Sequence, residues 1–186
     1  TRYDAKPTLA LFTFEGNGMN DEDVALYTGY LNLELHQTKS FILVEKIQIN
    51  ELLREKEYDK MDCKTADCAI EIGKLVGFKK AIVGSFSLVA DTCTIKGSLI
   101  GIESKEVEKT AERTYVGDLE GINPFVQIMA WEFAGLDAPK DIFNAVEIVD
   151  EVDEKKSIWR WINWAIKPFN YIANRVREFL PSQSSE

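Results

Sequence analysis

The sequence predicts an α/β domain in which helices flank a mixed β-sheet, followed by an amphipathic helical extension near the carboxyl end. Short apolar runs bounded by turn residues indicate strands, and segments with recognisable caps indicate helices. Along residues 9–135 the two alternate in the order β-α-β-α-α-β-β-β-α. Such an order is typical of a mixed sheet covered by helices.

The amino-terminal elements have local signals in the sequence. Residues 9–14 form an apolar run between Pro7 and Gly16, which predicts a buried strand. Asn20 is a good N-cap for a helix over residues 21–38, and the acidic residues after it complement the helix dipole. The core-facing stripe expected on this helix comprises Val24, Ala25, Tyr27, Leu31 and Leu35.

The middle of the chain continues the pattern. Thr65 is expected to cap a helix that stops at Gly77, where a left-handed residue is favoured. Leu52 and Leu53 are expected to point inward from an earlier helix. A turn is predicted at 15–20 and a helix at 49–57. Strands are predicted at 41–44, 81–89 and 93–102, and an edge or exposed strand at 106–116. Asn123 and Pro124 open a last helix, which Gly135 closes.

Composition and charge exclude several classes of protein. With 45% hydrophobic and 28% charged residues, the chain is globular rather than disordered. A net charge of −9 argues against nucleic-acid binding, which requires Lys and Arg to neutralise phosphates. No apolar run is long enough to cross a bilayer. The start at Thr1, without an initiator Met or a signal peptide, fits a processed mature protein, and a trimmed chain would look the same.

Gly16, Asn17 and Gly18 lie between a predicted strand and a predicted helix, where a dinucleotide-binding loop would be. Asp21 occupies the position of the third glycine, and acidic residues crowd the helix start that would hold a pyrophosphate. We therefore expect a tight turn. The single histidine, His36, has no identifiable catalytic partner, so we predict no enzyme activity and no cofactor.

Cys63 and Cys68 allow three interpretations: a disulfide, two reduced thiols or half of a metal site. Their spacing is longer than that of a redox Cys-x-x-Cys pair, and no second pair of ligands exists in the sequence. A disulfide would staple the loop before the third helix to its first turn. Cys93 alternates in phase with Ile95 and Leu99, which predicts a buried, unreactive thiol.

The last quarter of the chain changes in charge along its length. Residues 137–154 carry seven acids and one lysine, whereas residues 155–177 carry six bases and no acid. We therefore divide the chain into a domain at 1–136, an acidic linker at 137–156, a Trp-rich amphipathic helix or kinked helix pair at 157–181, and a disordered tail at 182–186.

Within residues 157–181 apolar side chains recur at spacings of three and four, which predicts a single stripe on a helix that Pro168 kinks or divides. Three interpretations stay open: the stripe packs on its own domain, lies on a membrane surface, or binds a partner protein. The residues expected to contact a partner or membrane are Ile158, Trp159, Trp161, Ile162, Trp164, Phe169, Ile172, Val176 and Phe179.

A family resemblance covers about residues 8–136. The run from Phe14 to Gly18, the segment at 41–53 and the stretches at 62–77, 81–88 and 93–100 resemble, in order and spacing, the CsgG-like family of bacterial envelope domains and its TolB-amino-terminal and LpoB-like relatives. Gly101, Ser104 and Lys105 depart from the family pattern. No pair of long alternating segments could form membrane hairpins, and no lipidation cysteine stands near residue 1.

The resemblance implies a non-catalytic periplasmic accessory or scaffolding subunit of a diderm bacterium, peripherally associated with the membrane. Its partners would be protein subunits of an envelope or membrane complex, bound through the carboxyl-terminal helix. A periplasmic location would also favour the Cys63–Cys68 bond. Two alternatives are a ligand sensor or enzyme that uses the turn at residues 15–18, and a self-associating structural subunit.

Overall fold

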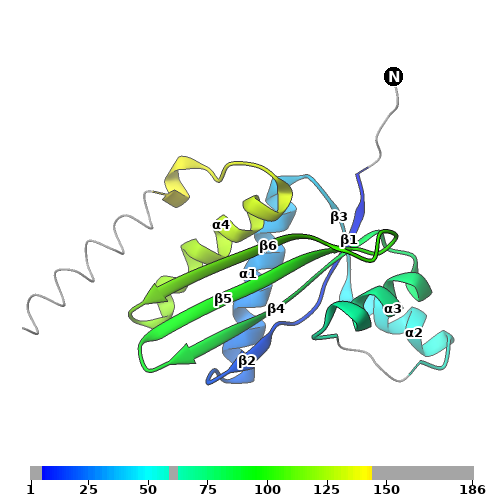
Figure 1. The fold of residues 1–186 in the computed structure, drawn as a ribbon, viewed down its shortest axis with the longest axis horizontal. Coiled ribbons are helices and arrows are strands. Elements are labelled where there is room, and N and C mark those ends of the chain that lie inside the picture. The colour runs from blue at the N-terminus through cyan, green and yellow to red at the C-terminus, as the bar shows by residue number, and fades with distance from the viewer. Residues whose placement is uncertain (1–5, 59–62, 144–186) are drawn as a thin grey trace, which may run out of the picture. The chain divides into compact units, whose positions relative to one another are not determined.

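The computed structural model describes residues 6–58 and 63–143 (Figure 1). Its strands form one mixed sheet in the order β3-β1-β4-β5-β6, and β2 pairs separately with β4. The predicted fold class, a mixed sheet flanked by helices, is therefore confirmed. The strands are β1 (Thr8–Leu11), β2 (Glu15–Asn17), β3 (Ile42–Val44), β4 (Lys80–Val89), β5 (Thr92–Gly101) and β6 (Val107–Val116).

The direction of each strand follows from the connection before it. Helices separate β1 from β3 and β3 from β4, and β1 pairs in parallel with both of these strands. Short turns join β4 to β5 and β5 to β6, and these neighbours are antiparallel. The strand predicted at residues 106–116 is the edge strand β6, as expected.

One predicted turn is instead partly a strand. Residues 15–17 were expected in a turn, but they form β2, which pairs in parallel with residues 85–87 of β4. Leu11 pairs with Ile82 and Glu15 with Ser85, so three residues of the first segment lie opposite two of β4. This extra residue interrupts the ladder, so the predicted strand at 9–14 ends as β1 at Leu11, and β2 begins at Glu15 within the predicted turn.

The helices are α1 (Asp21–Thr38), α2 (Lys46–Glu55), α3 (Ala66–Val76) and α4 (Asn123–Ala134), the last preceded by the short 3₁₀ helix η1 (Leu119–Ile122). The Asn20 side chain accepts a hydrogen bond from the backbone N–H of Asp23 at 2.8 Å, which confirms the predicted cap. Thr65 caps α3, and Gly77 follows it with a φ of 97°.

The start of α4 differs from the prediction. Asn123 was expected to be its N-cap, but its backbone is already helical because η1 leads directly into the helix. Ile122 takes the cap position without a side-chain hydrogen bond, and Asn123 Oδ1 is buried with no hydrogen-bond partner in the described part of the chain. Gly135 closes the helix in a left-handed conformation, as predicted.

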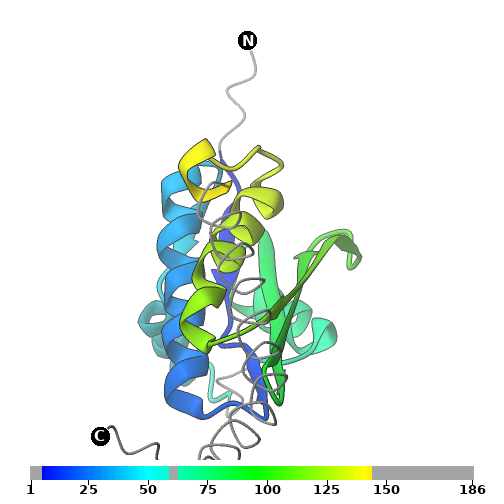
Figure 2. The ribbon, with the colours of Figure 1, turned by 90° about the vertical axis from the view of Figure 1, so that its left-hand side faces the viewer.

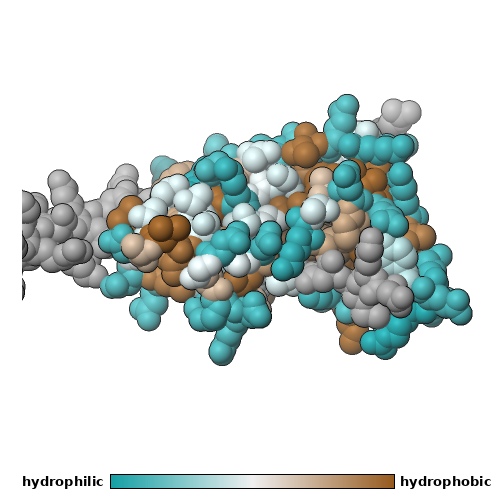
Figure 3. All heavy atoms as spheres, turned by 60° about the horizontal axis from the view of Figure 1, so that its bottom comes forward, coloured by the Kyte–Doolittle hydropathy of each residue, from teal (hydrophilic) through white to brown (hydrophobic). Residues whose placement is uncertain are grey.

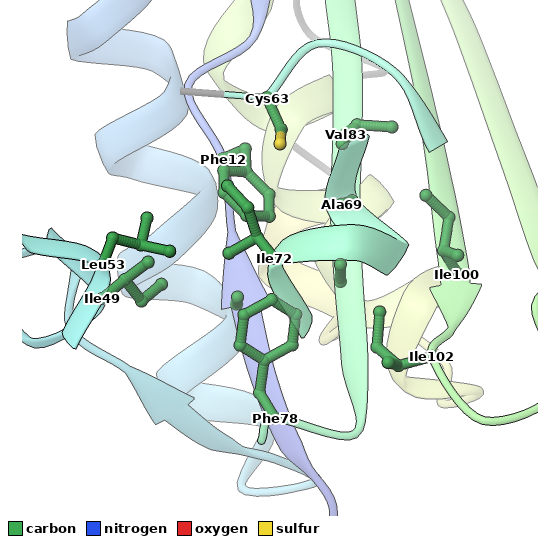
Figure 4. Close-up of a cluster of buried hydrophobic side chains, with 12 residues drawn as sticks. Phe12, Ile49, Leu53, Cys63, Ala69, Ile72, Phe78, Val83, Ile100 and Ile102 are labelled. Carbon is green, nitrogen blue, oxygen red and sulfur yellow. The ribbon is translucent and has the colours of Figure 1, made fainter. Parts of the chain in front are cut away.

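The two faces of the sheet have separate hydrophobic layers. On one face α1 and α4 lie side by side, and Tyr27 of α1 contacts Phe86 of β4 with ring centroids 6.2 Å apart (Figure 2). On the other face α2 and α3 enclose a cluster that includes Phe12, Ile72 and Phe78 (Figure 4). Alternate residues of the strands supply the two layers.

Two further expectations about burial need correction. Leu53 of α2 is fully buried, but Leu52 is 36% exposed because it lies on the outer side of the helix. Ala25 of α1 is exposed rather than part of the core stripe. In the segment predicted to be the linker, Ala138 and Ile142 are buried.

Candidate protein-binding surfaces

The residues predicted to contact a partner or membrane, from Ile158 to Phe179, lie outside the described residues. The contacts of that stripe therefore stay predictions. Between residues 6 and 143, the residues with candidate functional roles are the two cysteines, the segment at 15–18, the exposed surfaces of the helices and the uncovered part of the sheet.

The structure joins Cys63 and Cys68 by a disulfide, with their Cα atoms 5.5 Å apart. Cys63 is fully buried and belongs to the cluster under α2 and α3, while Cys68 lies in the first turn of α3. The bond thus fastens the incoming chain to the helix over the hydrophobic cluster. A loop this short is expected to stabilise the domain by about 2–3 kcal/mol.

Cys93 is buried on β5, at 1% exposure, and is not bonded to another cysteine. Burial raises the pKa of its thiol, which disfavours the reactive thiolate. The predicted description of Cys93 as a buried thiol is confirmed. His36 is exposed near the end of α1, as expected for a surface residue.

Packing explains why positions 16 and 18, in the segment at residues 15–18, are both glycine. Gly18 has a φ of 74°, and a Cβ there would lie 2.2 Å from the carbonyl oxygen of Leu88. A Cβ on Gly16 would lie 2.5 Å from Val24 of α1. The Asn20 cap and the carboxylate of Asp23 occupy the helix start, which is unsuited to an anion. These contacts favour a structural role for the segment.

Two open grooves border α3. One, of about 410 Å³, is lined by apolar side chains that include Val44 and Leu52 and by the carboxylates of Glu51 and Glu55. The other, of about 360 Å³, lies beside Lys74 and Glu103. In residues 6–58 and 63–143, no group of three or more His, Cys, Asp or Glu side chains is placed to bind a metal ion.

The helices differ in the surface that they present to solvent. From Val24 to Leu33, α1 has no charged residue, although its outer side includes Leu26, Tyr30 and Leu33 at 48%, 37% and 63% exposure. The side of a helix that faces solvent typically carries charged or polar residues. By contrast, exposed charged residues are spread along α2 and α3: Lys46, Glu51, Arg54, Glu55, Asp67, Glu71 and Lys74. Sequence reasoning identified only the inner stripe of α1, although the uncharged run was a visible signal of the outer one.

Side-chain hydrogen bonds link α1 to α4 and to η1. Trp131 of α4 donates its indole N–H to Glu34 of α1 at 2.6 Å, and Gln127 donates to the same carboxylate. Tyr27 donates its hydroxyl to the carbonyl oxygen of Leu119, and burial is the main reason that the pKa of Tyr27 is raised. These bonds hold α1 against α4 and η1. None of them involves the outer side of α1.

At the far end of the sheet face next to α2 and α3, none of the described helices covers the strands. There the outward-facing residues of β4 and β5 are largely serines and threonines, such as Ser85, Ser87 and Thr94, in register with Glu112 and Thr114 of β6. Figure 3 shows pale residues of intermediate hydropathy with separate hydrophobic patches on the lower side of Figure 1. Within the described residues, no helix combines the length and apolarity needed to span a bilayer.

The fold is similar to that of two solved bacterial protein domains. The LpoB C-terminal domain from Escherichia coli matches with a TM-score of 0.52 and 18% identity, over 62% of this chain and 86% of that one. The LpoB C-terminal domain from Salmonella enterica matches with a TM-score of 0.50 and 20% identity, over 60% of this chain and 84% of that one. No protein-family model and no curated protein sequence matches the chain.

At these identities the likeness concerns the fold, so the described residues adopt an LpoB-like α/β fold. It supports the LpoB-related part of the predicted resemblance at that level. The CsgG-like and TolB-like parts of that resemblance stay predictions.

Proposed function

We propose that this chain is a non-catalytic accessory or scaffolding subunit of the bacterial cell envelope, which acts by binding other proteins. The observation that carries the proposal is the likeness to the LpoB C-terminal domain over 86% of that domain. The resemblance seen in the sequence implies an envelope domain that works through protein contacts. The uncharged outer side of α1 supports the same role, because such a surface suits a protein interface.

The location that fits this role is the periplasm, with peripheral attachment to the membrane. The disulfide between Cys63 and Cys68 supports it, because such bonds persist in oxidising compartments and are rare in the cytosol. Catalysis is disfavoured by the structural roles of the polar candidates. Asn20 caps α1, the glycines of residues 15–18 serve close packing, and the Cys93 thiol is buried.

The segment proposed to attach the domain to an envelope assembly is the amphipathic one at residues 157–181. Its apolar stripe, basic charge and three tryptophans are typical of a partner-binding or membrane-surface helix. Deleting residues 157–186 should leave a folded domain but abolish its co-purification with the envelope assembly. Unchanged co-purification of the shortened chain would contradict the proposal.

A further inference from the structure

The outer side of α1 has a pattern that is unusual for a helix facing solvent. Leu26, Gly29, Tyr30 and Leu33 follow one another at helical spacings, so they form one stripe opposite the core side. The exposed residues from 25 to 37 include no Asp, Glu, Lys or Arg. Figure 2 shows α4 beside α1. We call these four residues the outer stripe.

Gly29, at the centre of the outer stripe, is not explained by packing inside the domain. Glycine within a helix costs about 1 kcal/mol relative to alanine. Apart from the two neighbouring residues and the nearby backbone of α1 itself, no heavy atom of the described residues lies within 4 Å of the place where its Cβ would be. What a glycine provides at such a position is a shallow gap, through which another backbone or a large side chain can approach from outside.

The outer stripe is also symmetric about its own centre. A point between Gly29 and Tyr30 is equally far along the helix from Leu26 and from Leu33. If a second α1 lies antiparallel on the first, each Leu26 meets Leu33 of the other copy. Each Tyr30 then meets the gap at Gly29. A contact about a two-fold axis requires this reciprocity, in which residue i meets j and j meets i.

The charges at the two ends of α1 favour the same arrangement. Asp21, Glu22 and Asp23 make its first turn acidic, while His36 lies in its last turn and Lys39 follows as the C-cap. In an antiparallel pair, each acidic end lies beside the other copy's basic end. A parallel pair would instead bring the two acidic ends together, which is unfavourable.

We propose that the occupant of the outer stripe is a second copy of this chain, with the two α1 helices packed antiparallel across a two-fold axis. This goes beyond the proposed envelope role, which requires no self-association. It also uses a different part of the chain from residues 157–181, so the two proposals can fail separately.

Sedimentation equilibrium of the full chain tests the dimer. The apparent mass should rise with concentration from 21.1 kDa toward twice that value. Leu33→Glu changes a largely exposed residue and should weaken the dimer at least tenfold. Ile47→Glu, at a residue of α2 that is 66% exposed, adds the same charge to a helix on the other face of the sheet and should leave the dissociation constant unchanged.

Three results of that experiment would overturn the proposal. One is a mass that stays monomeric at every concentration, and another is a Leu33→Glu variant that dimerises as tightly as the parent. The third is a Leu33→Glu variant of a monomeric chain that loses thermal stability, which would mean that the same chain covers the outer stripe.

Cysteine cross-linking tests the antiparallel direction. Leu26 and Leu33 are seven residues apart, about 10 Å along a helix, which is too far for a disulfide within one helix. The double variant Leu26→Cys, Leu33→Cys should therefore oxidise to a covalent dimer, whereas neither single variant should. Efficient cross-linking of either single variant would contradict the antiparallel arrangement.

Discussion

The two helical layers of the domain differ in how they are held and in what they present to solvent. The layer of α1 and α4 covers large buried side chains such as Leu31 of α1 and Phe86 of β4, and α1 has no charged residue from Val24 to Leu33. The layer of α2 and α3 is shorter, is closed by the Cys63–Cys68 bond and has exposed charges along both helices. The comparison separates a stretch of α1 surface without charge from the surface of α2 and α3, where charged residues lie among exposed apolar ones such as Ile47.

The largest expected loss of stability follows from a substitution in the α1 and α4 layer. Phe86 is fully buried between Phe14 and Tyr27, with ring centroids 5.2 and 6.2 Å away. Phe86→Ala should lower the free energy of unfolding by about 3–5 kcal/mol, because it removes apolar contacts and leaves a cavity. Urea denaturation measures this loss. A cost below about 1 kcal/mol would mean that this layer does not carry the core.

The next effect concerns the covalent bond in the α2 and α3 layer. The double variant Cys63→Ala, Cys68→Ala should lose about 2–3 kcal/mol of stability, since the unfolded chain is no longer constrained. Hydrogen exchange should increase most in α3, where the bond fastens the first turn. Reductant should destabilise the parent protein but not the variant, and equal sensitivity of the two would contradict the assignment.

A smaller loss of stability is expected when the N-cap of a helix is removed, and it should differ between the two layers. Asn20 accepts its hydrogen bond from Asp23 at 2.8 Å, whereas Thr65 accepts from the N–H of Cys68 at 3.4 Å. Each substitution by alanine should cost about 1 kcal/mol, with the larger loss for Asn20→Ala because its bond is shorter. Thermal denaturation of the two variants, beside an Asn32→Ala control within α1, checks this order. A larger loss for Thr65→Ala would reverse it.

The smallest effect is the response of Cys93 to pH. Because burial raises the pKa of this thiol, the folded state retains its proton at a pH where the unfolded state, with a pKa of about 8.5, has lost it. The contribution of the protonated thiol to stability is therefore complete below that pH and is lost as pH rises toward the native pKa.

Comparison with Cys93→Ala measures that contribution. The variant should lose less stability than the parent between about pH 8 and 10, the window that starts near the unfolded pKa. Equal losses in the two proteins would contradict a buried, perturbed thiol.

Local signals explain which parts of the fold the sequence could predict. The ends of α3 follow from Thr65 and Gly77, and the cap of α1 follows from Asn20, because each acts on neighbouring backbone groups. Strand β2 was missed because its partner, around Ser85, lies 70 residues further along the chain. The start of α4 was misplaced because η1 replaces the side-chain cap.

The candidate surfaces were predictable only in part. The disulfide was one of three interpretations of the spacing between Cys63 and Cys68, and sequence alone did not choose among them. The outer stripe of α1 was visible as ten residues without charge. It was missed because a search for the core-facing stripe accounts for only half of such a helix.

The measurement that tests the proposed function most directly is attachment of a Phe169→Asp variant to the envelope assembly. Phe169 lies in the middle of the predicted apolar stripe, whereas Arg160 is predicted on its polar face and provides a matched control, Arg160→Asp. If residues 157–181 bind a partner protein, Phe169→Asp should abolish co-purification while the melting temperature stays unchanged, and Arg160→Asp should have little effect on either. A Phe169→Asp variant that melts at a lower temperature yet still co-purifies would contradict the account.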